Sequence, residues 1–341
     1  METKKVVKVD VKESEKVKKI LGSKNLNLID KDFKIRKVDN FLLFPLVDDA
    51  GEDLKIKIKI KTKIKIKIRI EHAKMEKRRG IKNYKEHFPE ELRKKLPRAF
   101  DVVGDICIMK LPEELIGMSR EIGEAVIGSY KNIEVVCIDK GVGGEYRKRR
   151  IEIIGGERRT LTTHKEFGFS YKVDVSKTYF SPRLSGERQR VAKQVKSCER
   201  VLDMFCGVGP FSIPIAKRAK EVFAVDINPD AIELLKENTK LNRVDNVFPI
   251  LGDSKEVLRG ERFDRVIMNL PHSSLQFLTS AFERTKENSV INLYRFSESP
   301  DTTPIKKIAS ASNKKIEKIE SFKLHSYSKF ESLHCFDITT E

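Results

Sequence analysis

The second half of the chain alternates short apolar runs with amphipathic runs, and this alternation limits its fold more than any other feature. Five runs after about residue 197 read as strands: RVLDMFC, EVFAVDI, NVFPILGD, FDRVIMNLP and NSVINLYRF. Two runs between them, GPFSIPIAKRA and NPDAIELLKENTKLN, read as helices. Such alternation predicts an α/β fold with a mainly parallel, Rossmann-like sheet and helices on both faces. The end of the chain, KKIEKIESFKLHSYSKFESLHCFDITTE, predicts two further strands in a hairpin.

The first 174 residues predict two further parts. Residues 1–70 contain the helical EKVKKILGSKNLNLID and a candidate hairpin in which NFLLFPLV and LKIKIKI flank the turn-rich DDAGED. Residues 71–174 begin as a basic linker and continue as a mixed α/β pattern, with DVVGDICIMKL and NIEVVCIDKG as strands around the helical PEELIGMSREIGEAVIGSY. We therefore expect a small N-terminal domain at 1–70, a middle domain at 71–174 and the parallel sheet at 175–341.

Residues 55–70 read KIKIKIKTKIKIKIRI, with Lys or Arg at every odd position and Ile at every even position except Thr62. A period of two is a strand signal, because successive side chains point to opposite faces. At about 3.4 Å per residue the run would span roughly 50 Å, which is long for one strand of a small domain. Two interpretations stay open: a strand that continues into another element, or compositional drift in a chain rich in Lys and Ile.

The charge balance favours a polyanionic partner. The formal net charge is +18, and residues 55–98 hold 18 Lys and Arg against 5 Asp and Glu, a net +13. No apolar helical face accompanies this block, so nucleic acid is favoured over a membrane, with a solvated basic surface as the alternative. There is no apolar segment of signal-peptide or membrane-spanning length. Scattered cysteines without CxxC spacing and scattered histidines predict a cytoplasmic protein without disulfides or a metal site.

The first candidate site residues follow the strand RVLD. The run DMFCGVGP places Asp203, Phe205, Gly207 and Gly209 where a strand gives way to a helix. Glycines there let the backbone approach a ligand at the carboxyl end of the strand, where open α/β sheets bind their ligands. The spacing is GxG followed by Pro-Phe and not GxGxxG, which suits S-adenosylmethionine better than a dinucleotide.

Two further carboxylates follow the next two strands. Asp226 comes seventeen residues after Gly209, where a carboxylate can accept both ribose hydroxyls of an adenosine-containing ligand. Asp253, after the next strand, is placed to accept from the adenine amino group. Taken singly, Asp226 is also explained as a helix cap, although Asn228 is the better cap, and Asp253 as a loop residue. The three motifs in succession favour an adenosine site.

Asn269-Leu270-Pro271 follows the fourth strand. It resembles the (Asp/Asn)-Pro-Pro motif of enzymes that methylate nitrogen atoms in planar systems. Such an enzyme needs a carbonyl fixed at the edge of the sheet to grip the target while its nitrogen faces the methyl group. No cysteine lies near the motif, which argues against the covalent route of cytosine-C5 methylation. An antiparallel hairpin that finishes the sheet is also the layout of class I S-adenosylmethionine-dependent methyltransferases.

An upstream run, YFSPRLSGER at 179–188, together with GEYR at 144–147, resembles one family closely. With DMFCGVGPFSIPIA, INPDAIELLKEN and IMNLP, it is similar to the archaeal and eukaryotic tRNA (guanine-N1)-methyltransferases, which act on position 37 next to the anticodon. The resemblance runs from about residue 98 to the end, with a weaker match over the small N-terminal domain. It implies that residues 175–341 form the methyltransferase domain and that residues 1–70 contact tRNA.

The resemblance also implies roles for single residues. Guanine N1 carries a proton at neutral pH, so a general base must remove it, and this role falls to Glu187. Arg147 would stabilise the charge that builds on O6, and Asn269 would hold the base. The substrate contacts would be Tyr179, stacked on a flipped guanine, with Pro182 and Arg183. The implied S-adenosylmethionine contacts are Arg188, Asp203, Phe205, Gly207, Gly209, Asp226, Ile227, Asp253, Ser254, Asn269 and Pro271.

One departure from the family leaves the target open. After Asn-Leu-Pro the family often has a basic residue, then small residues and a histidine, whereas this chain has His272-Ser273-Ser274-Leu275. The alternatives are a wyosine-pathway enzyme on the same nucleotide, by C7 methylation or aminocarboxypropyl transfer, and a non-catalytic tRNA-binding protein. The implied partner is tRNA, at its anticodon stem-loop and outer corner, and we expect a monomer without a membrane or metal requirement.

Overall fold

The computed structural model describes residues 2–21, 28–30, 33–47, 68–75, 83–143, 148–326 and 331–341. By their internal contacts the residues form two compact units, 1–83 and 84–341. The first unit ends beyond the boundary predicted at residue 70, because that residue lies inside strand β4 (Ile68–Met75), which pairs with the first strand of the chain.

The N-terminal unit is a four-stranded sheet in the order β2-β3-β1-β4, with helix α1 (Ser14–Leu21) beside it. The three other strands are β1 (Glu2–Asp10), β2 (Arg36–Val38) and β3 (Phe41–Pro45). Alternate residues of β1 enter the core, where Val7 and Val9 pack with Val17 of α1. β3 pairs with β1 and β2, and its predicted hairpin partner at 54–60 lies outside the described residues. Of the Lys/Ile strip, only its last three residues, at the start of β4, are described.

The larger unit begins with a sheet in the order β5-β6-β7-β8. Its strands are β5 (Asp101–Val103), β6 (Ile106–Met109), β7 (Val135–Gly143) and β8 (Lys148–Gly156). The short helix α3 (Glu90–Arg93) precedes it, and α4 (Ser119–Ser129), entered through a 3₁₀ turn at Glu113–Met118, covers it. The sequence predicts one strand over DVVGDICIMKL, but the chain reverses at Gly104, whose φ is +60°, so two antiparallel strands form.

A two-stranded ribbon links this sheet to the parallel one. It consists of β9 (Leu161–Glu166), which the sequence analysis does not identify, and β10 (Phe169–Asp174). The loop after β10 contains the 3₁₀ turn Pro182–Leu184 and leads into α5 (Ser185–Gln194). This loop carries the predicted substrate contacts Tyr179, Pro182 and Arg183, and α5 carries the predicted base Glu187.

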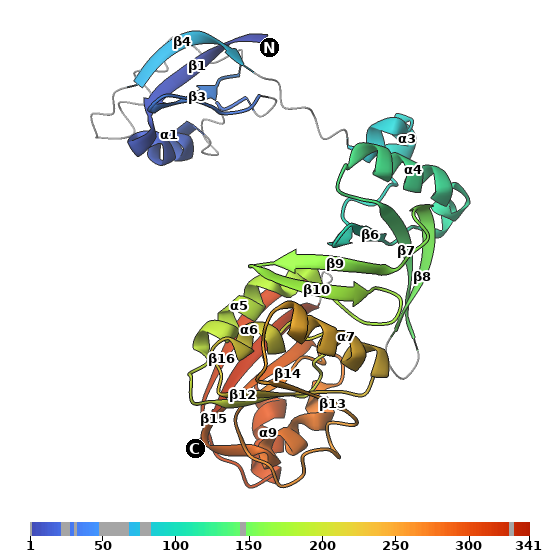
Figure 1. The fold of residues 1–341 in the computed structure, drawn as a ribbon, viewed down its shortest axis with the longest axis vertical. Helices are drawn as coiled ribbons and strands as arrows, with labels where there is room; N and C mark the ends of the chain where they lie inside the picture. The colour runs from blue at the N-terminus through green and yellow to red at the C-terminus, as the bar shows by residue number, and fades with distance from the viewer. Residues whose placement is uncertain are drawn as a thin grey trace. The chain divides into compact units, whose positions relative to one another are not determined.

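The remaining residues form a seven-stranded sheet in the order β13-β12-β11-β14-β15-β17-β16 (Figure 1). Its strands are β11 (Arg200–Asp203), β12 (Glu221–Asp226), β13 (Val247–Leu251), β14 (Phe263–Met268), β15 (Thr285–Ser297), β16 (Ile316–Ser326) and β17 (Ser332–Thr340). The first five in spatial order are parallel, and β17 is antiparallel to both β15 and β16. The predicted parallel sheet with a terminal antiparallel hairpin is therefore confirmed.

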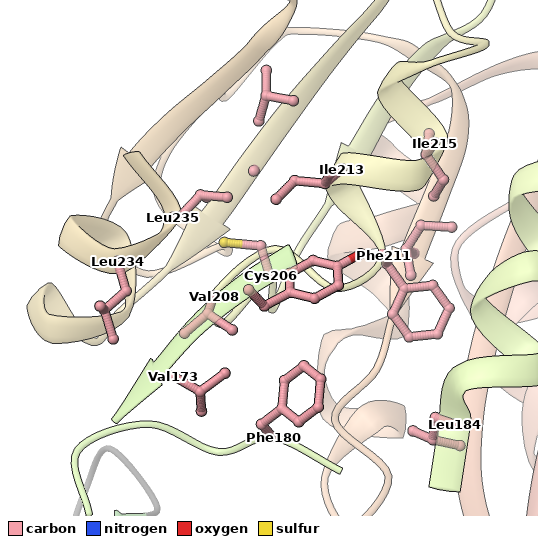
Figure 2. Close-up of a cluster of buried hydrophobic side chains, with 14 of the residues drawn as sticks. Val173, Phe180, Leu184, Cys206, Val208, Phe211, Ile213, Ile215, Leu234 and Leu235 are labelled. Carbon is pink, nitrogen blue, oxygen red and sulfur yellow. The ribbon is translucent and has the colours of Figure 1, made fainter. Parts of the chain in front are cut away.

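Two apolar layers enclose this sheet because successive strand residues face opposite sides. One layer packs against α5, α6 (Ser212–Ala216) and α7 (Pro229–Leu241), and the other against α8 (Leu278–Glu283) and α9 (Thr303–Ala311). Figure 2 shows part of the first layer, to which Phe180, Val208, Phe211 and Leu235 all contribute side chains. This layer fixes the turn that holds Gly207 and Gly209. In the described part of the chain, we find no helix with the length and apolar character needed to cross a membrane.

Candidate functional site

A cavity of about 1050 Å³ opens at the carboxyl ends of β11, β12, β13 and β14. The residues just after these strands line it, and they include Gly207, Asp226, Asp253 and Asn269. The middle sheet contributes other lining residues, such as Asp101 and Arg149. A ligand site at the carboxyl ends of parallel strands is the general expectation for an open α/β sheet, and the predicted motifs converge there.

The turn between β11 and α6 is built around Asp226. Gly207 has φ of +53°, and its N–H donates to Asp226 Oδ2 at 2.7 Å. The other oxygen, Oδ1, accepts from the N–H of Asn228 at 2.9 Å. The pKa of Asp226 is raised by burial, although these N–H groups act in the opposite direction. Asn228 caps α7, because its side chain accepts from Asp230, so Asp226 is not needed as the cap.

Asp203 lies beneath this turn and does not line the cavity. Its Oδ2 accepts from Ser212 Oγ at 2.7 Å, while Oδ1 is buried without a hydrogen-bond partner among the described residues. Burial raises the pKa of Asp203 to about 7, opposed by the Ser212 hydrogen bond and assisted by the charge of Asp226. Asp203, which the sequence predicted as a cofactor contact, is thus a buried carboxylate behind the glycine turn and not a residue that lines the cavity.

The loops after β13 and β14 also line the cavity. Ser254 lies here with a buried Oγ that has no partner among the described residues, next to the exposed Asp253. Asn269 and Pro271 line the same cavity. His272 begins the segment 272–275, which departs from the family pattern. Its ring packs against Phe296 with centroids 4.6 Å apart, and both residues line the cavity.

Arg188 reaches the cavity, but protein groups already bind its guanidinium. It makes a bidentate pair with Glu166 of β9, at 2.7 and 2.5 Å, and it donates to the carbonyl of Ser181 at 3.0 Å. Arg188 is 1% exposed. Burial raises the pKa of Glu166, but the hydrogen bonds from His164 and Arg188 outweigh it and the net shift is downward. Arg188 therefore fixes the loop that carries Tyr179, Pro182 and Arg183.

An aromatic ring and two arginines from the middle sheet and the loop after β10 line another part of the cavity. Tyr179 is 51% exposed and lines the cavity, with the Arg149 guanidinium 5.2 Å from its ring centroid. Arg149 also lies 3.7 Å from Asp139 and 3.9 Å from Asp101. Arg183 donates to Asp101 at 2.7 Å. The exposed ring and paired arginines suit a planar, anionic ligand such as a nucleotide.

The predicted general base, Glu187, is 7% exposed and does not line the cavity. Its carboxylate accepts from Arg190 and from the hydroxyl of Tyr294 in β15. Leu184 and Arg188, which are close to Glu187 in the sequence, do line the cavity.

The structure places the remaining predicted residues in three groups. Phe205 and Ile227 line the cavity, whereas Pro182 and Gly209 do not. Arg147 lies outside the described residues. Sequence reasoning missed Arg149, Glu166, Arg190 and Tyr294. Arg149 could have been noticed in the basic run YRKRR, whereas no local pattern marks the other three.

Comparison with known proteins identifies the arrangement. Three family models match the chain: the tRNA methyltransferase 5 N-terminal domain at 7–55, the TYW2 N-terminal domain at 82–160 and the TRM5/TYW2 methyltransferase domain at 162–320. A tRNA (guanine(37)-N(1))-methyltransferase Trm5b from Pyrococcus abyssi is 43% identical over 300 residues, covering 86% of this chain and 85% of that protein. This chain belongs to the TRM5/TYW2 methyltransferase family.

Solved structures extend the family relationship over both units. The crystal structure of Trm5b from Pyrococcus abyssi matches with a TM-score of 0.73 and 38% identity over 100% of both chains. A complex of aTrm5 with tRNALeu matches with a TM-score of 0.69 and 34% identity, over 99% of this chain and 100% of that chain. The TRM5/TYW2 relationship inferred from the motifs is confirmed.

The TYW2 branch of the family is a weaker match. The tRNA(Phe) (4-demethylwyosine(37)-C(7)) aminocarboxypropyltransferase of Methanocaldococcus jannaschii is 38% identical over 197 residues, covering 57% of this chain and 77% of that protein. Both branches therefore share the methyltransferase domain with this chain, but Trm5b matches much more of it.

Proposed function

We propose that this protein transfers a methyl group from S-adenosylmethionine to N1 of guanosine 37 in tRNA. The observation that carries the proposal is the single cavity on which Asp226, Asp253 and Asn269 converge with the exposed ring of Tyr179. An adenosine site and a base-stacking ring in one cavity are the two halves that base methylation needs. Trm5b from Pyrococcus abyssi, which matches most of this chain, is named for this reaction.

The residues present fit the cofactor. Asp226 is held by backbone N–H groups at the end of β12, as a ribose-binding carboxylate would be. The buried Ser254 Oγ, without a partner among the described residues, offers a further polar atom beside Asp253. We assign Phe205, Ile227, Asn269 and Pro271 to the same site because they line the cavity. When bound, the cofactor would supply an electrophilic methyl group, because the methyl carbon is attached to a positively charged sulfur. That sulfur leaves as a neutral thioether.

The chain must orient guanine and take its N1 proton. Tyr179 would stack on the flipped base, and Asn269, which lines the same cavity, would hold the base edge. A Glu187 Oε atom would accept the N1 proton as the N1 electron pair forms the new bond to carbon. Arg147 remains our choice to stabilise negative charge on O6. Arg188 and Glu166 would act indirectly, by fixing the loop that presents Tyr179.

The proposal extends to the partner and the setting. We propose that the second unit receives the anticodon stem-loop and that the N-terminal unit contacts the outer corner of tRNA. The net charge of +18 supports a tRNA partner, because phosphate contacts contribute most of the affinity in such complexes. A monomeric, cytoplasmic enzyme is the form we propose.

The experiment is a methylation assay on two tRNA transcripts that differ at position 37. With guanosine at this position, the enzyme is expected to incorporate methyl from labelled S-adenosylmethionine, and with adenosine there it is expected to incorporate none. Equal labelling of both transcripts would contradict the choice of target. Binding of tRNA without binding of S-adenosylmethionine in calorimetry would instead favour a non-catalytic tRNA-binding protein.

A further inference from the structure

A buried polar cluster surrounds Glu187 and connects α5 to the sheet. Arg190 Nε donates to Glu187 Oε2, and Arg190 Nη2 donates to Oε1, both at 2.7 Å. Tyr294 Oη donates to the same Oε1 at 2.8 Å. Three donors therefore hold a carboxylate whose side chain is only 5% exposed. None of them belongs to a residue that lines the cavity.

The same guanidinium serves a second carboxylate. Arg190 Nη1 donates to Asp337 Oδ2 at 2.6 Å, and Nη2 donates to Oδ1 at 3.1 Å. Gln194 and Asn292 donate to Asp337 as well, at 3.0 and 2.6 Å. The Arg190 guanidinium also lies 4.2 Å from the ring centroid of Phe322. One cation thus links two carboxylates, and Asp337 keeps other partners if the link to Glu187 is broken.

The charges of this cluster follow from its surroundings. Burial, with the nearby Cys335 and Glu187, raises the pKa of Tyr294, so its hydroxyl keeps the proton that it donates. Burial raises the pKa of Asp337, but hydrogen bonds from Arg190 and Gln194 outweigh it and the net shift is downward. Burial, Asp337 and Glu187 raise the pKa of the Cys335 thiol, which stays neutral. The ionisable groups around Glu187 are therefore the Arg190 cation, the Asp337 anion and the neutral side chains of Tyr294 and Cys335.

We propose that Arg190, Tyr294 and Asp337 are positioning residues that hold Glu187 in place and control its release toward the cavity. The inference rests on the proposed function, in which Glu187 accepts the N1 proton. A carboxylate with three donors outside the cavity must give up at least one before it can accept from a base inside it. Asp337 lowers the cost of that step, because it competes for Arg190 and retains the guanidinium once Glu187 turns away.

Tyr294→Phe tests the neutral donor. It removes one hydroxyl and leaves the ring, which packs against Phe211, in place. Loss of a donor to a carboxylate favours its protonated form. In single-turnover methylation of the guanosine-37 transcript between pH 5 and 9, the acid limb of the rate profile is expected to move up by about one pH unit. The plateau rate is expected to stay within about threefold of wild type.

Asp337→Asn tests the competing anion. Without that charge, Arg190 binds Glu187 alone, so the acid limb is expected to move to lower pH, opposite to Tyr294→Phe. The plateau rate is expected to fall about tenfold or more, because Glu187 is released less easily. The control is Asp264→Asn in β14, which also removes a carboxylate paired with a cation, Lys286, but lies away from the cluster.

Opposite shifts, with a wild-type profile for Asp264→Asn, support the proposal. Unchanged limbs, limbs that move in the same direction, or a shift in the Asp264→Asn control overturn it. If Asp337→Asn fails to fold, Tyr294→Phe alone decides the question. Glu187→Gln distinguishes failure of the proposed function from failure of the positioning role. Full methylation by this variant contradicts Glu187 as the base. Loss of methylation in Glu187→Gln, with unmoved acid limbs in Tyr294→Phe and Asp337→Asn, contradicts only the positioning role of the cluster.

Discussion

The two glycines in the turn after β11 are required for different physical reasons. Gly207 has a left-handed φ of +53°, but a Cβ there would lie in ordinary contact, 3.7 Å from the Tyr179 carbonyl. Gly209 has φ of +90°, and its Cβ would lie 2.4 Å from Leu235 Cδ1 in the core. The motif therefore marks a ligand turn at Gly207 and a packing constraint at Gly209, which does not line the cavity.

Gly209→Ala is expected to lower the free energy of unfolding by about 2 kcal/mol or more, through backbone strain and overpacking. The matched control is Gly186→Ala in α5, where a Cβ meets nothing within 4 Å. That substitution should change stability by less than about 1 kcal/mol, and in the stabilising direction, because Ala favours helix. Denaturant unfolding of both variants measures the difference, and equal effects would contradict the packing argument.

Asp203 predicts how stability depends on pH. Its pKa is about 7 in the folded protein and near 3.8 when exposed, so between these values the folded state binds a proton that the unfolded state lacks. Stability from this group is therefore present below about pH 4 and is lost as pH rises toward 7. Each unit of upward pKa shift corresponds to about 1.4 kcal/mol.

Asp203→Asn removes this titration. Thermal unfolding from pH 5 to 8 is expected to show a steeper loss of stability for wild type than for the variant. Parallel curves would mean that the carboxylate at position 203 titrates alike in the folded and unfolded states.

At the scale of elements, two side chains of α7 supply the hydrogen bonds that a neighbouring strand would make with the backbone of β10. Asn238 accepts from the N–H of Lys172 at 2.7 Å and donates to its carbonyl at 3.0 Å. Asn242, one turn later, makes the same pair of hydrogen bonds with Ser170. The two amides imitate the edge of a sheet, so they dock the ribbon that precedes the substrate loop onto the methyltransferase sheet.

Asn238→Ala is expected to destabilise the protein by about 2–4 kcal/mol, because it leaves buried backbone groups unpaired, including the carbonyl of Val208. Glu233→Ala, on the exposed face of the same helix, should cost less than about 0.5 kcal/mol. The midpoint of thermal unfolding reports both variants. A loss for Asn238→Ala no larger than for Glu233→Ala would refute the docking role.

The sequence was sufficient for elements whose signals are local. Alternating strands and helices predicted the parallel sheet with its terminal antiparallel hairpin, and the glycine turn and the Asn-Leu-Pro motif predicted residues that line the cavity. It was insufficient where the partner is distant in sequence. Arg188 reads as a cofactor contact until Glu166 is found beside it, and Glu187 reads as a free base until Tyr294 and Arg190 are seen to hold it. The chain reverses at Gly104 and begins a second strand at Ile106, and a single Gly is too short a signal to distinguish this hairpin from one continuous strand.

For the whole molecule, charge is the property most relevant to its partner. The Lys/Ile strip contributes eight of the positive charges, and all but its last three residues lie outside the described part of the chain. Phosphate contacts add affinity but no base specificity. We therefore expect the strip to influence tRNA affinity and not turnover.

Changing Lys57, Lys59, Lys61 and Lys63 to Gln is expected to weaken tRNA binding. The slope of the logarithm of the binding constant against the logarithm of the salt concentration should become shallower by at most about 3 to 4. Turnover at saturating tRNA should stay near wild type. The control changes four exposed lysines of α7 and α9 to Gln: Lys236, Lys240, Lys306 and Lys307. Equal flattening by both sets would assign the effect to net charge, and an unchanged slope for the strip variant would leave compositional drift as its explanation.

The central claim is that this fold methylates guanine N1, and the identity of the product tests it most directly. Guanosine-37 tRNA is incubated with enzyme and S-adenosylmethionine, digested to nucleosides and analysed by mass spectrometry beside authentic standards. A parallel reaction uses tRNA that carries the tricyclic wyosine precursor. We predict N1-methylguanosine from the first substrate, lost in Glu187→Gln. An aminocarboxypropyl adduct, or C7 methylation of the precursor with no product from guanosine, would contradict the account.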